Sequence, residues 1–278
     1  MPELPELRAL SERLDAAVAG RELTGATVLG FSGLKTVSPG PAALVGTELR
    51  RVTSRGKFLV FEFTADRRAL VHLGNAGRVD LEEPAKATRP RGSLVRLEFG
   101  ASGLLVREHG TERRAGLWVL GAGDDGPLRA LGPEPADAAF EDLILHGDDR
   151  RHLHTMLRDQ HTVAGIGRGY ADDVLHRAML SPFATLSKLD ATSRERLLDA
   201  VRDVLDEALE SERRRTGGLS QGSLGDRFTI HRRAGSPCPR CSRQLERVSY
   251  SSHEVAYCPT CQTKGKVLAD RRMSRLLR

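Results

Sequence analysis

Apolar residues near the start of the chain recur with helical spacing. Between residues 5 and 20 they stand three or four positions apart, at Leu7, Leu10, Leu14 and Val18. Such spacing places the four side chains on one face and predicts an amphipathic helix.

From about residue 23 to residue 120 the pattern changes to short apolar runs separated by Gly, Pro and polar turns. Runs at this spacing, with no helical segment between them, are typical of an antiparallel sandwich or barrel. The predicted strands are 25–31, 47–52, 58–63, 70–73, 93–99, 103–106 and 117–120.

After a stretch rich in Gly, Pro and Asp, the second half of the chain becomes helical. A capping-box pattern at Thr192 and Glu195, followed by one apolar face, makes the last of these helices the best supported. The predicted helices are 140–146, 151–159, 170–179 and 193–214. Strands followed by helices predict the α+β fold class.

The positive charge of the chain predicts that the protein is attracted to polyanions. Of the 278 residues 39% are hydrophobic and 29% are charged, and no apolar run is long enough to cross a bilayer. The acidic start is unlike a signal peptide, so we expect a cytoplasmic protein. The net charge is +6, and Arg and Lys crowd the C-terminal third, as in many phosphate-binding surfaces.

All four cysteines belong to one pattern. Cys238 and Cys241 form one Cys-x-x-Cys pair, and Cys258 and Cys261 form a second, with sixteen residues between the pairs. This spacing is typical of a tetrahedral zinc site on a β-hairpin. Two disulfides are the alternative, but they need an oxidising compartment. Because four thiolates leave no position for water, we expect a structural zinc that directs the hairpin tip, residues 248–255, toward a partner.

A glycine-rich segment precedes the predicted helix 170–179. Gly165, Gly167 and Gly169 would let backbone amides approach a phosphate at a helix N-terminus, which favours anions. Most glycine-rich turns bind nothing, so an ordinary turn is the alternative.

The first six residues are Met-Pro-Glu-Leu-Pro-Glu. Removal of Met1 would make Pro2 the terminus, with a secondary amine beside the carboxylate of Glu3. A secondary amine that condenses with a sugar C1′ gives an iminium that cannot be neutralised by losing a proton, so it withdraws electrons from the neighbouring carbon. The alternative is purely structural: Pro5 starts the helix, and Glu3 and Glu6 complement its dipole.

Taken in order, these motifs resemble the formamidopyrimidine-DNA glycosylase and endonuclease VIII family over essentially the whole chain. The resemblance implies a DNA repair enzyme that excises oxidised or ring-opened bases and nicks the strand at the abasic site. Pro2 would form the Schiff base and Glu3 would donate a proton to the opening sugar. The implied partner is double-stranded DNA with damaged bases or abasic sites. The implied protein is a monomer, associated with the nucleoid when bound, with one zinc ion and no organic cofactor.

The resemblance also implies domains and further site residues. Lys57 matches a hairpin lysine that reaches the lesion and its phosphate, and His72 matches a backbone contact, with a buried structural histidine as the alternative. The implied catalytic residues are Pro2, Glu3, Lys57 and His253, and the implied DNA-binding residues are His72, Asn75, Arg113, Gly165, Gly167, Arg168 and Tyr170. The implied domains are a β-sandwich over 1–132, a linker over 133–139, a helix-two-turn-helix domain over 140–228, a zinc finger over 229–262 and a basic tail over 263–278.

Several positions depart from the family. Where the formamidopyrimidine branch fills the emptied base stack with Met, Arg and Phe, this chain has Asn75, Arg113 and Ala115. The Asn of the glycine turn is replaced by Arg168, and the hairpin Arg by His253, whose contact would depend on pH. The nucleophile and the zinc ligands are unchanged, so the departures affect recognition of the base more than the lyase chemistry.

The choice of lesion therefore stays open. A strong preference for 8-oxoguanine opposite cytosine is not expected, whereas oxidised pyrimidines, ring-opened purines and abasic sites all fit. Two other classes also fit: a non-catalytic protein that binds damaged or structured DNA, and an RNA-binding zinc-ribbon protein.

Overall fold

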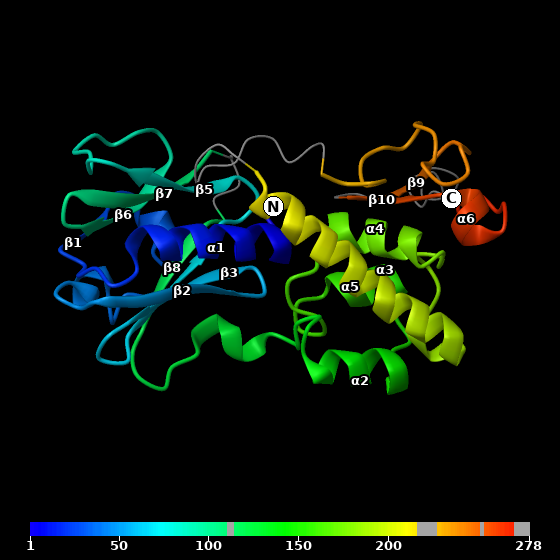
Figure 1. The fold of residues 1–278 in the computed structure, drawn as a ribbon, viewed down its shortest axis with the longest axis horizontal. Coiled ribbons are helices and arrows are strands. Elements are labelled where there is room, and N and C mark those ends of the chain that lie inside the picture. The colour runs from blue at the N-terminus through cyan, green and yellow to red at the C-terminus, as the bar shows by residue number, and fades with distance from the viewer. Residues whose placement is uncertain (110–113, 216–226, 251–252, 270–278) are drawn as a thin grey trace, which may run out of the picture. The chain divides into compact units, whose positions relative to one another are not determined.

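The chain forms two compact units (Figure 1). The computed structural model describes residues 1–109, 114–215, 227–250 and 253–269. The first unit comprises Met1–Ala130 and Leu209–Leu224, and the second comprises Leu131–Ala208 and Gly225–Arg278.

The first unit is a sandwich of two four-stranded antiparallel sheets, with strand orders β1-β6-β7-β5 and β2-β3-β4-β8. Apolar side chains of both sheets meet in one buried core, among them Val52, Phe61, Val95 and Val106. The strands are β1 (Gly25–Val28), β2 (Leu49–Arg55), β3 (Phe58–Phe63), β4 (Arg68–His72), β5 (Gly77–Glu82), β6 (Ser93–Phe99), β7 (Ser102–Glu108) and β8 (Gly116–Leu120).

Helix α1 (Leu4–Val18) packs against β2 and contributes to the same core. Its predicted apolar stripe is buried: Leu14 and Val18 have no exposed surface, and Leu7 and Leu10 are at most 5% exposed. The amphipathic helix predicted from the spacing is confirmed.

Strand β5 is absent from the sequence prediction. Polar residues interrupt its apolar pattern, and in the sheet they pair with neighbours: Asp80 forms an ion pair with Arg107 of the adjacent strand β7. The pairing depends on a partner 27 positions away, so the local pattern does not reveal it.

The second unit is a helical bundle with a β-hairpin. Phe140, Leu153, Val174 and Val201 are fully buried in its core. Its elements are α2 (Ala138–His146), α3 (Leu153–Arg158), α4 (Arg168–Arg177), α5 (Ala191–Arg213), β9 (Glu246–Ser249), β10 (Glu254–Tyr257) and α6 (Pro259–Thr263). The two four-stranded sheets lie in the first unit and most helices in the second, so the predicted α+β class is confirmed.

Helix α5 begins earlier than predicted. Asp190 caps it, since its Oδ1 accepts a hydrogen bond from Ser193 N at 2.8 Å. The predicted cap at Thr192 is wrong, because Thr192 already lies inside the helix. The last residues of α5 belong to the first unit, where Arg213 pairs with Glu12 of α1 at 2.6 Å.

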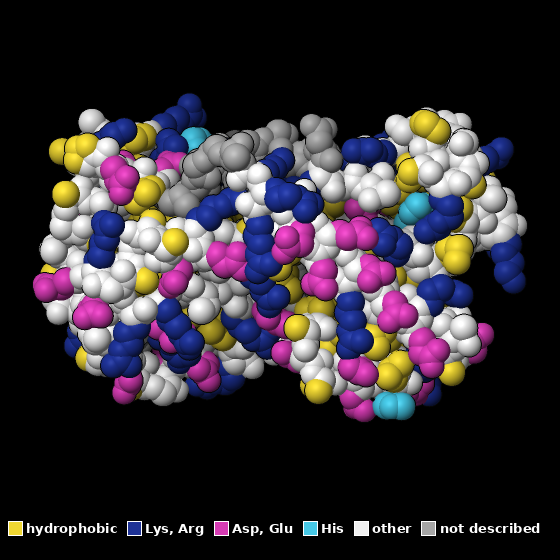
Figure 2. Space-filling model, in the orientation of Figure 1, with side chains coloured by type: hydrophobic (Ala, Val, Ile, Leu, Met, Phe, Trp, Pro, Cys, Tyr) yellow, Lys and Arg dark blue, Asp and Glu magenta, His cyan; other side chains and the backbone are white. Residues whose placement is uncertain are grey.

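Side chains of both signs lie along the exposed face of α5 (Figure 2). Arg177 of α4 pairs with Glu207 at 2.6 Å, and Arg202 pairs with Glu141 of α2 at 2.7 Å. Exposed pairs of this kind stabilise a fold by only about 0–1 kcal/mol, but here they neutralise basic residues. Among the described residues, no helix combines the length and apolarity that crossing a bilayer requires.

Candidate nucleic-acid interface and metal centre

The N-terminal residues form the first turn of α1. Glu3 is the N-cap: its carboxylate accepts from the Glu6 amide, and Glu6 Oε2 accepts from Glu3 N at 2.6 Å. This capping box fixes two carboxylates that are only 5% and 1% exposed. Pro2 directly precedes the cap and is half-buried, at the end of the helix where the dipole is positive. The role of the two glutamates as helix caps is therefore compatible with a nucleophilic role for Pro2.

Lys57 and His72 lie close together in the first unit. Lys57, in the turn between β2 and β3, is only 5% exposed, unlike an ordinary turn lysine. His72 ends β4, and its Nδ1 accepts from Gly74 N at 3.2 Å. Burial lowers the pKa of His72, the charge of Lys57 lowers it further, and Glu108 acts in the opposite direction. The imidazole is therefore neutral near pH 7, beside a buried ammonium.

Glu108 is a site residue that the sequence analysis misses. It is 5% exposed, and its carboxylate accepts from the amides of Arg114 at 3.0 Å and Ala115 at 3.1 Å. It thereby fixes the backbone at Arg114 and Ala115. Arg113 lies outside the described residues. A single glutamate at a strand end has no local pattern that would identify it.

Asn75 and Ala115, the other two positions at which the family fills the emptied base stack, differ in exposure. Asn75 is exposed in the tight turn between β4 and β5, which Gly77 N closes by donating to Leu73 O at 2.7 Å. Ala115 is 1% exposed and packs in the sandwich core. In this structure, Asn75 is at the surface and Ala115 is not.

The glycine-rich turn leads into α4 in the second unit. Gly167 is the N-cap, and Gly165 adopts a φ of 97°, which favours glycine. Gln160 fixes the turn, because its Oε1 accepts from Gly165 N at 2.9 Å and its Nε2 donates to Ile166 O at 2.6 Å. Arg168 is exposed at the first position of the helix.

Tyr170 has a different environment from Arg168. It is 2% exposed, and its ring meets Phe228 edge-on with centroids 5.2 Å apart. A Cβ at Gly169 would lie 2.2 Å from the same Phe228 ring, so only glycine permits this approach. Tyr170 supports the turn from the core, whereas Arg168 is accessible to an anion.

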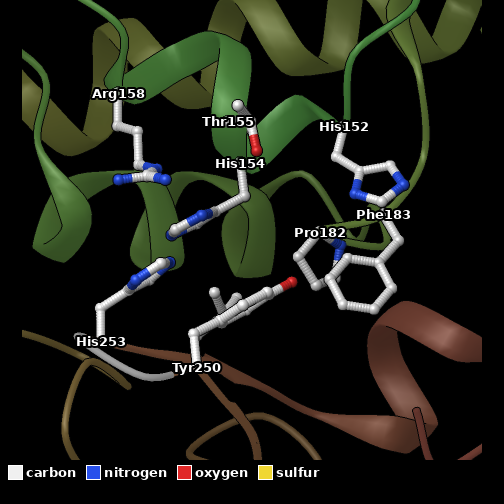
Figure 3. Close-up of a pocket in the computed structure, with 9 residues that line it drawn as sticks. His152, His154, Thr155, Arg158, Pro182, Phe183, Tyr250 and His253 are labelled. Carbon is white, nitrogen blue, oxygen red and sulfur yellow. The ribbon is translucent and has the colours of Figure 1, made fainter. Parts of the chain in front are cut away.

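His253 directly precedes strand β10 of the hairpin. It lies beside His154 and Arg158 of α3 (Figure 3). Burial lowers the pKa of His253 to about 4, helped by the positive charges of Arg158 and Arg168. The structure therefore brings Arg168 and His253, two residues that depart from the family the sequence resembles, into one electrostatic environment.

Asp172 is the acidic residue of this environment, and it is already engaged. It is 1% exposed, with Oδ2 2.6 Å from His231 Nδ1 and Oδ1 3.2 Å from His154 Nε2. No local pattern in the sequence marks it, because an acidic residue on a helix is usually solvated. Its charge raises the pKa of His253, against the effect of Arg158 and Arg168.

The neighbouring Asp173 connects α4 to the segment before the hairpin. Its carboxylate accepts from the amides of Thr229 at 2.7 Å and Ile230 at 2.9 Å. Burial raises the pKa of Asp173 to about 6. These backbone contacts fix the path of the chain between the bundle and the four cysteines.

The four cysteine sulfurs fit a tetrahedral zinc ion. All four Sγ atoms lie within 4.8 Å of one another, with 3.9 Å between Cys238 and Cys261 and 3.5 Å between Cys241 and Cys258. Zinc–sulfur bonds of about 2.3 Å in a tetrahedron require sulfur separations of about 3.8 Å. The predicted structural zinc, with Cys238, Cys241, Cys258 and Cys261 as ligands, is confirmed.

Contacts from α4 and the segment after it hold this centre. His176 Nε2 lies 3.2 Å from Cys238 Sγ, where an imidazole N–H donates to a thiolate. Arg240 donates to His176 O at 2.8 Å, and Gln262 Nε2 donates to Leu180 O at 2.9 Å. The zinc hairpin is therefore an integral part of the second unit.

Three family matches follow the chain in order. Residues 1–117 match the formamidopyrimidine-DNA glycosylase N-terminal domain, residues 131–218 the formamidopyrimidine-DNA glycosylase H2TH domain, and residues 235–264 the zinc finger found in FPG and IleRS. The second match is the helix-two-turn-helix region that the resemblance implies.

Relatives and solved structures extend the similarity over the chain. A formamidopyrimidine-DNA glycosylase of Thermus thermophilus is 34% identical over 95% of this chain and 100% of its own length. An uncharacterized formamidopyrimidine-DNA glycosylase-like protein of Mycobacterium tuberculosis is 42% identical over 54% of this chain and 96% of its own length. The structure of MutM in complex with carbocyclic 8-oxo-G containing DNA has the same fold, with a TM-score of 0.84, 23% identity, and coverage of 94% of this chain and 100% of that chain. The chain belongs to the formamidopyrimidine-DNA glycosylase family.

Proposed function

We propose that this protein is a DNA glycosylase and abasic-site lyase that acts on double-stranded DNA with oxidised or ring-opened bases. One observation carries the proposal: in a chain of this family, Pro2 directly precedes the buried Glu3 cap of α1. The names of the relatives and of the DNA-bound neighbour point to the same substrate class.

In the proposed reaction, Met1 is removed and the nitrogen of Pro2 attacks C1′ of the damaged nucleotide. The glycosidic bond breaks, and the base leaves with its electron pair and takes the N–H proton that Pro2 gives up. The C1′–O4′ bond then opens, O4′ takes a proton from Glu3, and the electron pair of nitrogen forms the iminium. Transfer of a proton from C2′ to water supplies electrons to the iminium and breaks the C3′–O bond, so the phosphate leaves and the strand is nicked.

Contacts to the strand come from both units. Lys57 reaches the lesion and its phosphate, and His72 contacts the backbone beside it. The amides of Gly165 and Gly167, together with Arg168, bind phosphate at the start of α4. His253 contacts a phosphate from the hairpin and assists the second elimination. Tyr170, which is buried, acts by supporting the glycine turn.

The gap left by the extruded base is filled by Asn75 and Arg113. Ala115 lies in the core and is too small to act as a wedge. With only one long side chain for this task, the enzyme is not expected to prefer 8-oxoguanine opposite cytosine, and its range extends to oxidised pyrimidines, ring-opened purines and plain abasic sites.

The remaining expectations belong to the same proposal. The protein acts as a monomer in the cytoplasm and associates with the nucleoid through DNA. Its domains are the sandwich over 1–132, the linker over 133–139, the helix-two-turn-helix domain over 140–228, the zinc finger over 229–262 and the basic tail over 263–278.

The test is borohydride trapping on duplexes that carry an abasic site, 8-oxoguanine or an oxidised pyrimidine, after mass spectrometry has verified removal of Met1. A covalent adduct mapped to Pro2 is expected with the abasic site, and the lesions that also trap define the glycosylase range. DNA binding with no adduct on any duplex would overturn the enzyme and favour a non-catalytic protein that binds damaged DNA. The departures at Asn75, Ala115, Arg168 and His253 motivate that second candidate.

A further inference from the structure

A cavity of about 270 Å³ lies within the second unit, between α3, the segment 182–183 and the hairpin (Figure 3). Two pairs of stacked rings line it. Tyr250 stacks on His253 with centroids 4.5 Å apart and planes 5° apart, and His152 stacks on Phe183 at 4.8 Å and 21°. Figure 3 shows the first pair extending from the hairpin and the second lying at the other end of the cavity.

Polar groups lie between the two aromatic pairs. His154, Thr155 and Arg158 extend from α3 into the same space (Figure 3). Arg158 lines the cavity and is partly exposed, so its guanidinium can donate to an acceptor that a ligand brings.

The size and lining of the cavity limit the ligand. Pockets for drug-sized molecules occupy about 300–1,000 Å³, so this one holds a single small group. Stacked rings at both ends favour a flat aromatic ligand, and Thr155 with the imidazoles offers hydrogen bonds to its polar edge. Arg158 favours an attached anion. A base linked to a phosphate has all of these properties, whereas inorganic phosphate alone would leave the aromatic rings unused.

We propose that this pocket binds one unpaired nucleotide, with its base between Tyr250 and Phe183 and its phosphate at Arg158. The pocket shares His253 with the phosphate contact proposed for the hairpin. The inference therefore deepens the proposed function and rests on it, and its test measures binding rather than nicking. The nucleotide is either part of an unpaired strand or a free mononucleotide.

The test uses the full-length, zinc-loaded protein and two probes. Fluorescence anisotropy compares an undamaged blunt duplex with the same duplex carrying a four-nucleotide single-stranded extension, and calorimetry measures binding of dGMP. We expect tighter binding of the extended duplex. Phe183→Ala and Tyr250→Ala should each reduce that affinity about tenfold, the usual loss on removal of one base–aromatic stack. Affinity for the blunt duplex should change less than about twofold.

Two variants serve as controls. Tyr250→Phe keeps the ring and should retain the preference for the extended duplex. Phe31→Ala removes a ring that is 86% exposed and does not line the pocket, and it should have no effect. Zinc content and thermal melting verify that each variant is folded.

Each outcome decides the proposal. Preference for the extension, lost in both alanine variants, identifies the unpaired strand as the ligand. Binding of dGMP that the same variants abolish, without preference for the extension, identifies a free nucleotide. A wild-type protein that binds neither probe at this site, or alanine variants that weaken the blunt duplex equally, would overturn it whether or not the lyase is active.

Discussion

Two histidines of the proposed DNA-binding surface, His72 and His253, are both neutral near pH 7, but their surroundings differ. His72 lies beside Lys57, and Glu108 offsets part of that positive charge. His253 lies beside Arg158 and Arg168, and Asp172 offsets part of their positive charge. One lysine thus acts against one acid at His72, whereas two arginines act against one acid at His253.

The difference indicates a division of roles. A balanced and largely buried cluster keeps its geometry without a ligand, as a reacting centre requires. A cluster with excess cationic charge is stabilised when an anion arrives, as a phosphate-binding site requires. Changes in the first unit should therefore affect chemistry more than binding, and changes in the second should affect binding more than chemistry.

The largest effect is expected at Pro2. Pro2→Gly leaves a primary amine whose imine can lose its charge, so nicking at an abasic site should fall on the order of 100-fold or more, with DNA affinity nearly unchanged. Single-turnover nicking and anisotropy on the same duplex measure the two quantities. Pro5→Ala, which alters the other proline of this turn, should keep most of the activity. Equal losses of nicking and affinity in Pro2→Gly would contradict the division of roles between the two units.

Removal of zinc should have the next largest effect. Binding of structural zinc contributes about 10–16 kcal/mol in finger peptides, so a chelator should unfold the hairpin. The hairpin carries His253, and its loss should weaken DNA binding by about tenfold or more. Anisotropy during titration with the chelator, with free zinc followed by a colorimetric dye, measures this. Unchanged affinity after the metal is gone would show that the hairpin does not contact DNA.

The sequence predicts features that depend on neighbouring positions along the chain. The stripe of α1 and the cysteine spacing are local patterns, and both are confirmed. Strand β5 and the cap of α5 are not predicted correctly. Strand β5 is paired through Asp80 with a distant strand. Helix α5 starts at Ala191, where Asp190 accepts from Ser193 N, so Thr192 lies inside the helix.

The candidate site shows the same limit. Asp172 and Glu108 are ordinary acidic residues in the sequence, and their importance comes from groups distant in the chain: Asp172 contacts His231, and Glu108 acts on the pKa of His72. The exposed Arg168 and the buried Tyr170 stand two positions apart in one motif, and only packing against Phe228 separates their roles.

A smaller effect is expected at Arg168, within the cationic cluster. Arg168→Ala should reduce affinity about tenfold and lower the salt dependence of binding by about one counterion, because one phosphate contact is lost. Nicking at saturating enzyme should stay near the wild-type rate. Arg202→Ala is the matched control, since that arginine of the second unit pairs with Glu141. Affinities measured between 50 and 200 mM salt, roughly, give the slope, and an unchanged slope in Arg168→Ala would exclude a phosphate contact.

The smallest effect concerns the pH dependence at His253. In the free protein its pKa is about 4, and a bound phosphate favours the protonated imidazole, so the pKa should be higher in the complex. Binding then takes up a proton, and affinity should rise a few-fold as the pH falls from about 8 toward 5. His253→Arg is charged throughout and should remove this rise, whereas the exposed His146→Gln should retain it. His154, Arg158, Arg168 and Asp172 face the same imidazole, and a rise that persists in His253→Arg would show that His253 is not the group that takes up the proton.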